Sequence, residues 1–132
     1  GSTIRMWSTV DGAAVRTLPG HGNLVLSMVF SADGAQLYSA SSDKTIRAWS
    51  TVDGTHLRTH NEHTSIVGTL ALSGDGAHLF SGSIDKTIRI WKTSDGSLVT
   101  TIDTGAKVTS LTFSPDGGKL YSGSFDGKIL IW

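Results

Sequence analysis

The sequence predicts an all-β protein built from short antiparallel strands, and two observations support that prediction. Asp-Gly pairs divide the chain at 11–12, 33–34, 53–54, 75–76, 95–96 and 116–117. Asp-Gly favours tight reversals because glycine adopts positive φ without steric cost. The runs between these pairs are short and rich in Val, Ile, Leu, Thr, Ser and aromatic residues, as in strands joined by hairpins. No stretch carries a capped 3.6-residue hydrophobic period, so we expect essentially no helix.

One pattern of eleven residues recurs along the chain at nearly constant spacing. Its best copy runs from Ser81 to Trp91, other copies end at Trp49 and Trp132, and a truncated copy ends at Trp7. The four tryptophans are separated by 42, 42 and 41 residues. A fixed period in this range indicates repeated supersecondary units. We therefore interpret 1–132 as a single segment with a partial repeat at 1–20 and repeats at 21–62, 63–103 and 104–132.

Each repeat is expected to contribute four strands to an antiparallel sheet. In chain order the expected strands lie at 3–8, 13–18, 24–31, 36–41, 45–50, 56–60, 65–73, 78–83, 87–92, 98–102, 107–114, 119–124 and 128–132. In the strand at 65–73, bulky Leu70 and Leu72 alternate with small Thr69 and Ala71. Neither face is charged, so each sheet should pack on both sides. Sheets packed on both sides at constant period predict propeller blades rather than a two-sheet sandwich.

The residues also carry a family resemblance. The Gly20-His21 pair, the Ser-Pro-Asp-Gly turn at 114–117, the Ser-Gly-Ser-x-Asp segments and the Trp closing each repeat resemble the WD-repeat β-propeller family. The resemblance covers essentially the whole chain and about three repeats. The chain departs from the family at two points. The Asp that should follow each Trp is absent, and Thr104 stands where the third repeat should carry His.

The resemblance implies a hydrogen-bonded tetrad in each blade, which would hold the turn and satisfy buried polar groups. By position the sets are His21, Ser39, Asp43 and Trp49, then His63, Ser81, Asp85 and Trp91, and an incomplete Ser122, Asp126 and Trp132. Ser, His and Asp also form nucleophilic triads, so a hydrolase is one hypothesis. An enzyme needs one nucleophile beside one oxyanion hole, not a copy in every unit. We therefore expect no catalytic residues and no cofactor.

Three smaller groups of residues are further candidate sites. Ser42, Ile84 and Phe125 precede the turn aspartates and are predicted to line a partner-contact rim, the alternative being tips packed against the adjacent blade. His56, His60 and His63 have helical spacing for zinc. On a strand His56 and His60 share a face, but His63 points away or lies in the loop, and no Cys or acidic cluster accompanies them, so no metal site is expected. Arg5, Arg47 and Arg89 recur two residues before Trp. We expect their stems to pack over the sheet, with each guanidinium paired to an acid.

Composition limits the classes of partner. Eleven basic and eleven acidic residues give a net charge of +0 without runs of like charge, so we expect neither nucleic acid nor a membrane surface as partner. No apolar stretch approaches the ~20 residues of a membrane span. The absence of cysteine leaves the compartment open, and family habit favours the cytoplasm. The remaining expectation is a scaffold that binds a protein or peptide.

Three repeats pose a problem of closure, because propellers typically have four to eight blades. An uncovered apolar sheet face of a few hundred Å² forfeits on the order of 10 kcal/mol. Additional copies, as a dimer with six blades or a trimer with nine, or the remainder of a longer propeller would cover it. The strand at 13–18 can complete a neighbour's last blade, but the strand at 3–8 duplicates the place of 128–132. This surplus favours a segment of a longer propeller, with a self-assembling block as the alternative.

Overall fold

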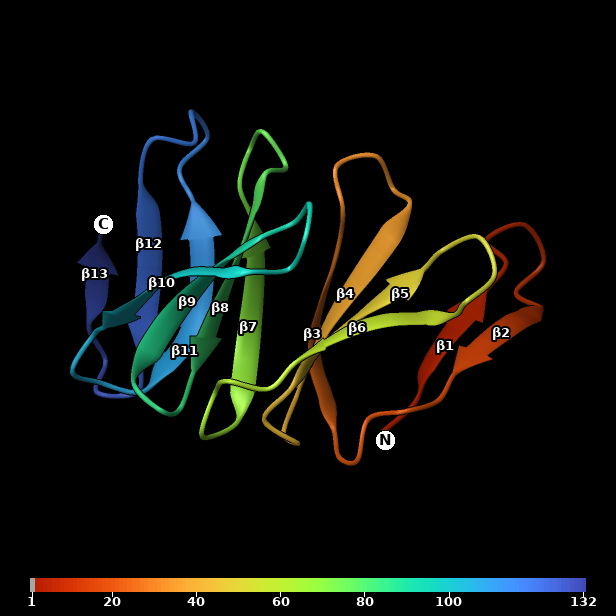
Figure 1. Cartoon of the computed structure of the whole chain (residues 1–132), viewed down its shortest axis with the longest axis horizontal. Helices are drawn as coiled ribbons and strands as arrows, with labels where there is room; N and C mark the ends of the chain where they lie inside the picture. The colour runs from red at the N-terminus through yellow and green to blue at the C-terminus, as the bar shows by residue number, and fades with distance from the viewer. Residues whose placement is uncertain (1) are drawn as a thin grey trace.

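The computed structural model describes residues 2–132, and over that range the chain contains strands, turns and loops but no helix (Figure 1). No helix within these residues could therefore cross a membrane. The strands are β1 (Ile4–Trp7), β2 (Ala14–Leu18), β3 (Val25–Phe30), β4 (Gln36–Ser41), β5 (Ile46–Ser50), β6 (His56–His60), β7 (Val67–Leu72), β8 (His78–Ser83), β9 (Thr87–Lys92), β10 (Leu98–Asp103), β11 (Val108–Phe113), β12 (Leu120–Ser124) and β13 (Ile129–Ile131). The all-β prediction is confirmed, and every strand end lies within two residues of its expected position.

The strands form four antiparallel sheets that follow chain order. Two sheets are complete, β3-β4-β5-β6 and β7-β8-β9-β10, whereas β11-β12-β13 has three strands and β1-β2 has two. The first strands of successive sheets, β3, β7 and β11, contact one another in turn. Figure 1 shows the sheets side by side, from β1-β2 at the right to β13 at the left. The arrangement is an open arc of propeller blades, as the sequence predicted.

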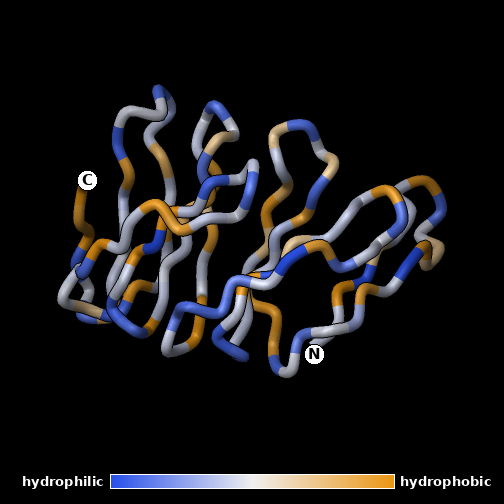
Figure 2. The backbone as a smooth tube through the Cα atoms, in the orientation of Figure 1, coloured by the Kyte–Doolittle hydropathy of each residue, from blue (hydrophilic) through white to orange (hydrophobic). Residues whose placement is uncertain are grey.

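The Asp-Gly pairs form the reversals that the sequence predicted. Between β3 and β4, Asp33 Oδ1 accepts hydrogen bonds from Ser31 Oγ at 2.6 Å and from the Ala35 backbone N–H at 2.9 Å. Gly34 then adopts a φ of 71°, which costs a residue without Cβ little. Figure 2 shows apolar residues along the strands and hydrophilic residues at the tips of the β3–β4, β7–β8 and β11–β12 hairpins, whereas the tips of β1–β2 and β5–β6 also carry apolar residues.

The core lies between the sheets rather than within one sheet. Its largest cluster joins Val67, Leu70, Leu79 and Trp91 of the second complete sheet to Tyr38, Ala40, Ile46 and Ala48 of the first. The backbone N–H of Leu70 also donates to Ser27 Oγ across this joint, and that of Leu111 donates to Thr69 Oγ1 across the next, both at 3.2 Å. The bulky face of each blade therefore packs on the small face of the blade before it.

At the two ends of the arc, sheet faces that are buried between interior blades are exposed. Leu70 is 8% exposed between blades, but Met28 and Phe30, at the matching positions of the first complete sheet, are 54% and 59% exposed. At the other end, Ile129 is 72% exposed although Ile46, its counterpart between blades, is 0% exposed. Positions that are equivalent in the repeat thus differ in burial according to which neighbours are present, because Met28 lacks a complete preceding blade and Ile129 lacks both a fourth strand and a following blade.

Candidate functional site

The first complete blade joins its polar residues into one hydrogen-bonded chain. Trp49, in β5, donates its indole N–H to Ser39 Oγ in β4 at 2.8 Å, and Ser39 Oγ lies 2.7 Å from His21 Nε2. On the other side of the ring, His21 Nδ1 lies 2.8 Å from Asp43 Oδ2 in the β4–β5 turn. The carboxylate accepts from Nδ1–H, so Nε2 is free to accept from the serine hydroxyl.

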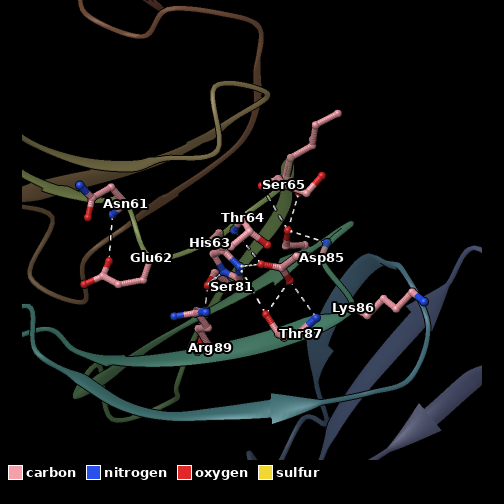
Figure 3. Close-up of polar contacts among 12 residues, drawn as sticks. Asn61, Glu62, His63, Thr64, Ser65, Ser81, Asp85, Lys86, Thr87 and Arg89 are labelled. Carbon is pink, nitrogen blue, oxygen red and sulfur yellow. Dashed lines mark hydrogen bonds and ion pairs between the residues drawn. The ribbon is translucent and has the colours of Figure 1, made fainter.

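The second complete blade repeats this geometry nearly atom for atom. His63 Nδ1 lies 2.7 Å from Asp85 Oδ2 and His63 Nε2 lies 2.7 Å from Ser81 Oγ, while the Trp91 indole N–H donates to Ser81 Oγ at 3.0 Å. Figure 3 shows His63 between Ser81 and Asp85, with Thr87 below the carboxylate. The loop before β7, the hairpin β8–β9 and strand β9 itself are therefore tied at one point.

Each complete network also contains a threonine, which sequence reasoning missed. Thr45 donates its backbone N–H to Asp43 Oδ1 at 2.9 Å and its hydroxyl to the same oxygen at 2.6 Å. Thr87 does the same for Asp85, at 2.9 and 2.6 Å. The signal was present in the repeated Asp-Lys-Thr of these two turns, where the third repeat reads Asp-Gly-Lys. A hydroxyl two residues after the aspartate closes the turn locally.

These donors hold the turn aspartates in the ionised form. Burial alone would raise the pKa of Asp43, but hydrogen bonds from Thr45, His21 and the Gly22 backbone outweigh it, so its pKa lies well below the ordinary range. The pKa of Asp85 is lowered for the same reasons. Burial lowers the pKa of His63, against the opposing pull of Asp85. The network of the second complete blade therefore favours a neutral His63 imidazole beside a carboxylate at neutral pH.

The third blade holds only part of the set. Trp132 donates its indole N–H to Ser122 Oγ at 2.9 Å, but Asp126 is not brought to this pair. Asp126 instead accepts from the hydroxyl of Ser124, and its side chain is 45% exposed. Thr104, at the position of the missing histidine, donates its backbone N–H to the Lys86 carbonyl at 2.9 Å. Without an imidazole to bridge them, the turn and the tryptophan are held separately.

The networks do not have the accessibility of a nucleophilic site. Ser39 and Ser81 are 0% exposed, and each Oγ already contacts both an indole N–H and an imidazole nitrogen. The nearest neighbour of each serine is thus another part of the fold, and no side of the hydroxyl is open to a substrate. We interpret the sets as devices that fix the turn geometry.

The three closely spaced histidines contact different parts of the structure, although His56 and His60 lie on one strand, β6. His56 bonds Thr59 at 2.8 Å and packs edge-on against Trp49, whereas His60 packs against Trp91 at 4.5 Å between ring centroids. His63 belongs to the network of the second complete blade. Within residues 2–132, no three or more His, Cys, Asp or Glu side chains gather in an arrangement that could hold a metal ion.

The recurrent arginines differ from the expectation. The Arg47 guanidinium lies against Gly20, where a Cβ would meet Arg47 Nη1 at 2.6 Å. The expected pairing to an acid is wrong, because no ion pair to Arg47 or Arg89 is present in the described part of the chain. Their Nε atoms are buried without a hydrogen-bond partner there. The side chains are half-buried on strands β5 and β9.

The predicted rim residues lie at the tips of the turns that the aspartates fix. The backbone N–H groups of Ser42, Ile84 and Phe125 donate to the carbonyls of Leu24, Ile66 and Lys107, at 2.9, 3.0 and 2.9 Å. Ser42 and Ile84 are half-buried, and Phe125 is 75% exposed. Each tip is therefore paired with the residue that enters the first strand of its own sheet.

Sheets of this kind, stacked at a constant period and tied by His–Asp–Ser–Trp networks, define a β-propeller repeat protein. Three stretches of the chain, residues 12–50, 54–92 and 96–132, match the family described as WD domain, G-beta repeat. The chain therefore belongs to the WD40 family.

Relatives agree with this assignment. The chain is 50% identical over 44 residues to vegetative incompatibility protein HET-E-1 of Podospora anserina, which covers 33% of this chain and 3% of that protein. Among solved structures, a chain of the mitotic checkpoint complex superposes with a TM-score of 0.91 at 28% identity, and the RRP9 WD40 repeats superpose with 0.89 at 27%. Both matches cover 99% of this chain but only 44% and 42% of those chains.

Proposed function

We propose that this chain is a non-catalytic scaffold for protein–protein interaction and that a partner binds the rim formed by the β4–β5, β8–β9 and β12–β13 turns. WD40 proteins generally act as interaction scaffolds, and one of the structural neighbours is a chain of a multi-protein complex. The observation that carries the proposal is the exposed aromatic side chain of Phe125, 75% exposed on a turn of fixed geometry. Exposed aromatic side chains on a rigid support often serve as anchors in interfaces.

The chemistry of the rim favours an apolar partner with acidic residues. Beside Phe125, Leu24 is 50% exposed and Ile66 37% exposed at the paired positions of the other blades. Lys107 Nζ lies 5.6 Å from the centroid of the Phe125 ring, and Lys44 and Lys86 are exposed at the tips of the other two turns. A peptide with an aromatic or aliphatic anchor and flanking carboxylates would match this surface.

Selection of a random peptide library on the immobilised chain tests the rim. The unmodified chain and the F125S variant are screened in parallel, with V52S as the control because Val52 is 82% exposed outside the rim. We expect acidic peptides with an apolar anchor to be enriched on the unmodified chain and on V52S but not on F125S. Enrichment of the same peptides on all three chains, or of none on any, would refute the rim.

Two further measurements separate the rim from its alternatives. F125S should change the free energy of unfolding by no more than about 0.5 kcal/mol, as for other surface substitutions. A large loss of stability would favour a tip packed for structural reasons, and I84S, at a half-buried position, extends the comparison. A serine-directed covalent probe that labelled Ser81 stoichiometrically would contradict the non-catalytic assignment.

A second candidate function, self-assembly, is favoured by a different observation. The two outer sheets expose apolar positions that are buried in the interior of the arc, such as Met28 at one end and Ile129 at the other. Covering one face with another copy would place Met28 in the environment that Leu70 already occupies, and covering the other would bury the position of Ile129, whichever copy supplies the strand there. Phe125 lies in the rim and Met28 in an end face, so each proposal is tested by a variant of its own.

A further inference from the structure

One end of the arc carries a groove in the place of two missing strands. The hairpin β1–β2 corresponds to the third and fourth strands of a blade, and Ile4 and Leu18 pack on Leu37 and Trp49. Beside it, where the first and second strands would lie, is an apolar groove of about 340 Å³. Its apolar lining consists of Ile4, Met6, Leu18, Met28, Phe30 and Leu37.

The other end carries the strands that the groove lacks. The sheet β11-β12-β13 has the first three strands of a blade but no fourth. Ser110 and Thr112 are exposed on its outer face, and Ile131 is 59% exposed. Ala48, which corresponds to Ile131, is 0% exposed because the next blade covers it.

An unused hydroxyl marks this outer face. Ser27 and Thr69, at the positions that correspond to Ser110, each accept a hydrogen bond from a backbone N–H of the following blade. The Ser110 hydroxyl makes no hydrogen bond to any residue within 2–132. The missing donor, by the same register, is the backbone N–H of Met28 in another copy.

We propose that the two ends dock on each other in a second copy of this chain, head to tail. The inference rests on the self-assembly named above and specifies its interface. Strands β11 and β12 of one copy fill the groove beside the partner's β1–β2, and the partner's Met28 N–H donates to Ser110 Oγ. The occupant is a second copy because both faces match the interior joints position by position, in bulk and in hydrogen bonding.

When the two ends dock, the partner's β1 and the chain's own β13 compete for the same position beside β12, and we infer that β1 takes it. Strand β13 pairs only with β12, and Ile129 and Ile131 are mostly exposed. Strand β1 is anchored better, because Ile4 is 7% exposed within a core cluster. The partner's β1 therefore displaces β13 and pairs with β12, and the partner's β2 becomes the missing fourth strand. Trp7, 54% exposed within its own chain, then donates its indole N–H to Ser122 Oγ in place of Trp132.

Mass and cross-linking test the interface together. We expect a closed assembly with twice or three times the 13.9 kDa mass of the chain. The chain has no cysteine, so the M28C and S110C variants can be mixed and treated with a short bifunctional maleimide. Cross-links should form in the mixture but not with either variant alone. The mixture of V10C with V52C is the matched control, because Val10 and Val52 are 94% and 82% exposed outside both end faces.

Each outcome decides one part of the proposal. A monomer at every concentration tested would overturn both self-assembly and the interface, and would mean that other polypeptide covers the end faces. An oligomer without the link between positions 28 and 110 would overturn the interface and leave self-assembly standing. The M28E variant should dissociate the assembly at least tenfold more readily than V52E, and equal behaviour would also overturn the interface.

Two deletions test the exchange itself. A variant that lacks residues 128–132 should keep the mass of the assembly, because the partner's β1 takes that place. A variant that lacks residues 1–7 should lose it. The reverse result, in which assembly survives the loss of residues 1–7 but not that of 128–132, would refute the exchange while keeping the docked faces.

Discussion

Replacing Ser81 with alanine would remove the atom that joins two halves of the second network. Ser81 Oγ accepts from the Trp91 indole at 3.0 Å and donates to His63 Nε2 at 2.7 Å. Trp91 is 1% exposed and His63 is 4% exposed. Water therefore cannot reach either group to replace the lost hydroxyl.

The expected loss follows from this burial. Each buried donor or acceptor left without a partner costs about 1–3 kcal/mol. With two such groups, S81A should lower the free energy of unfolding by about 3 kcal/mol. Ser122 provides the internal comparison, because it serves only Trp132, which is 41% exposed. For S122A we expect a loss of about 0.5–1 kcal/mol, since water replaces the lost partner.

Urea unfolding followed by tryptophan fluorescence and circular dichroism measures both variants. The slope of the unfolding free energy against urea concentration should be the same for each variant as for the unmodified chain, so that a change in the unfolding free energy reports stability. Equal losses for S81A and S122A, or a loss below about 1 kcal/mol for S81A, would refute the view that the complete network stabilises the blade through buried hydrogen bonds.

Two further predictions concern the joints between blades. A Cβ at Gly82 would lie 2.6 Å from Val108 Cγ1 and 2.8 Å from Thr69 Cγ2, so G82A should destabilise the chain by about 1–3 kcal/mol through overpacking. At Gly68 a Cβ meets no atom within 4 Å, so G68A is the control, and equal unfolding midpoints for the two variants would contradict the prediction. Burial lowers the pKa of His60 and of His63. As the pH falls, these histidines therefore bind protons in the unfolded chain before they do so in the folded chain. The stability that neutral His60 and His63 contribute is present above about pH 6.5 and is lost as the pH falls below it. The H60L variant introduces the residue that Leu18 supplies at the matching position of β2, and it should reduce this loss of stability between about pH 6.5 and 5. An unchanged dependence of the unfolding midpoint on pH would show that His60 does not contribute.

The repeat in the sequence was sufficient to predict the strands and the blades. The Asp-Gly reversals are local. The aspartate side chain accepts from the backbone N–H two residues later and the glycine adopts positive φ, so no distant residue is needed to form the turn. The members of the networks were implied by the resemblance to the WD-repeat family, and the repeat itself indicated only that residues at equal positions should adopt equal geometry. Asp126 shows the limit of that reasoning. Its position matched the family, but without a histidine and a threonine its carboxylate bonds only within its own turn.

What the sequence by itself determined was the alternation of bulky and small side chains in each repeat. Which of those faces is buried was decided only by the tertiary structure. Ile46 and Ile129 occupy one position of the repeat and have identical side chains, yet one is 0% exposed and the other 72%. The burial of Ile46 depends on the next blade, whose Val67 and Leu70 belong to the same core cluster, and a local pattern cannot record whether such a neighbour is present. The packing of His60 against Trp91 likewise joins two blades, so no single repeat could have predicted it.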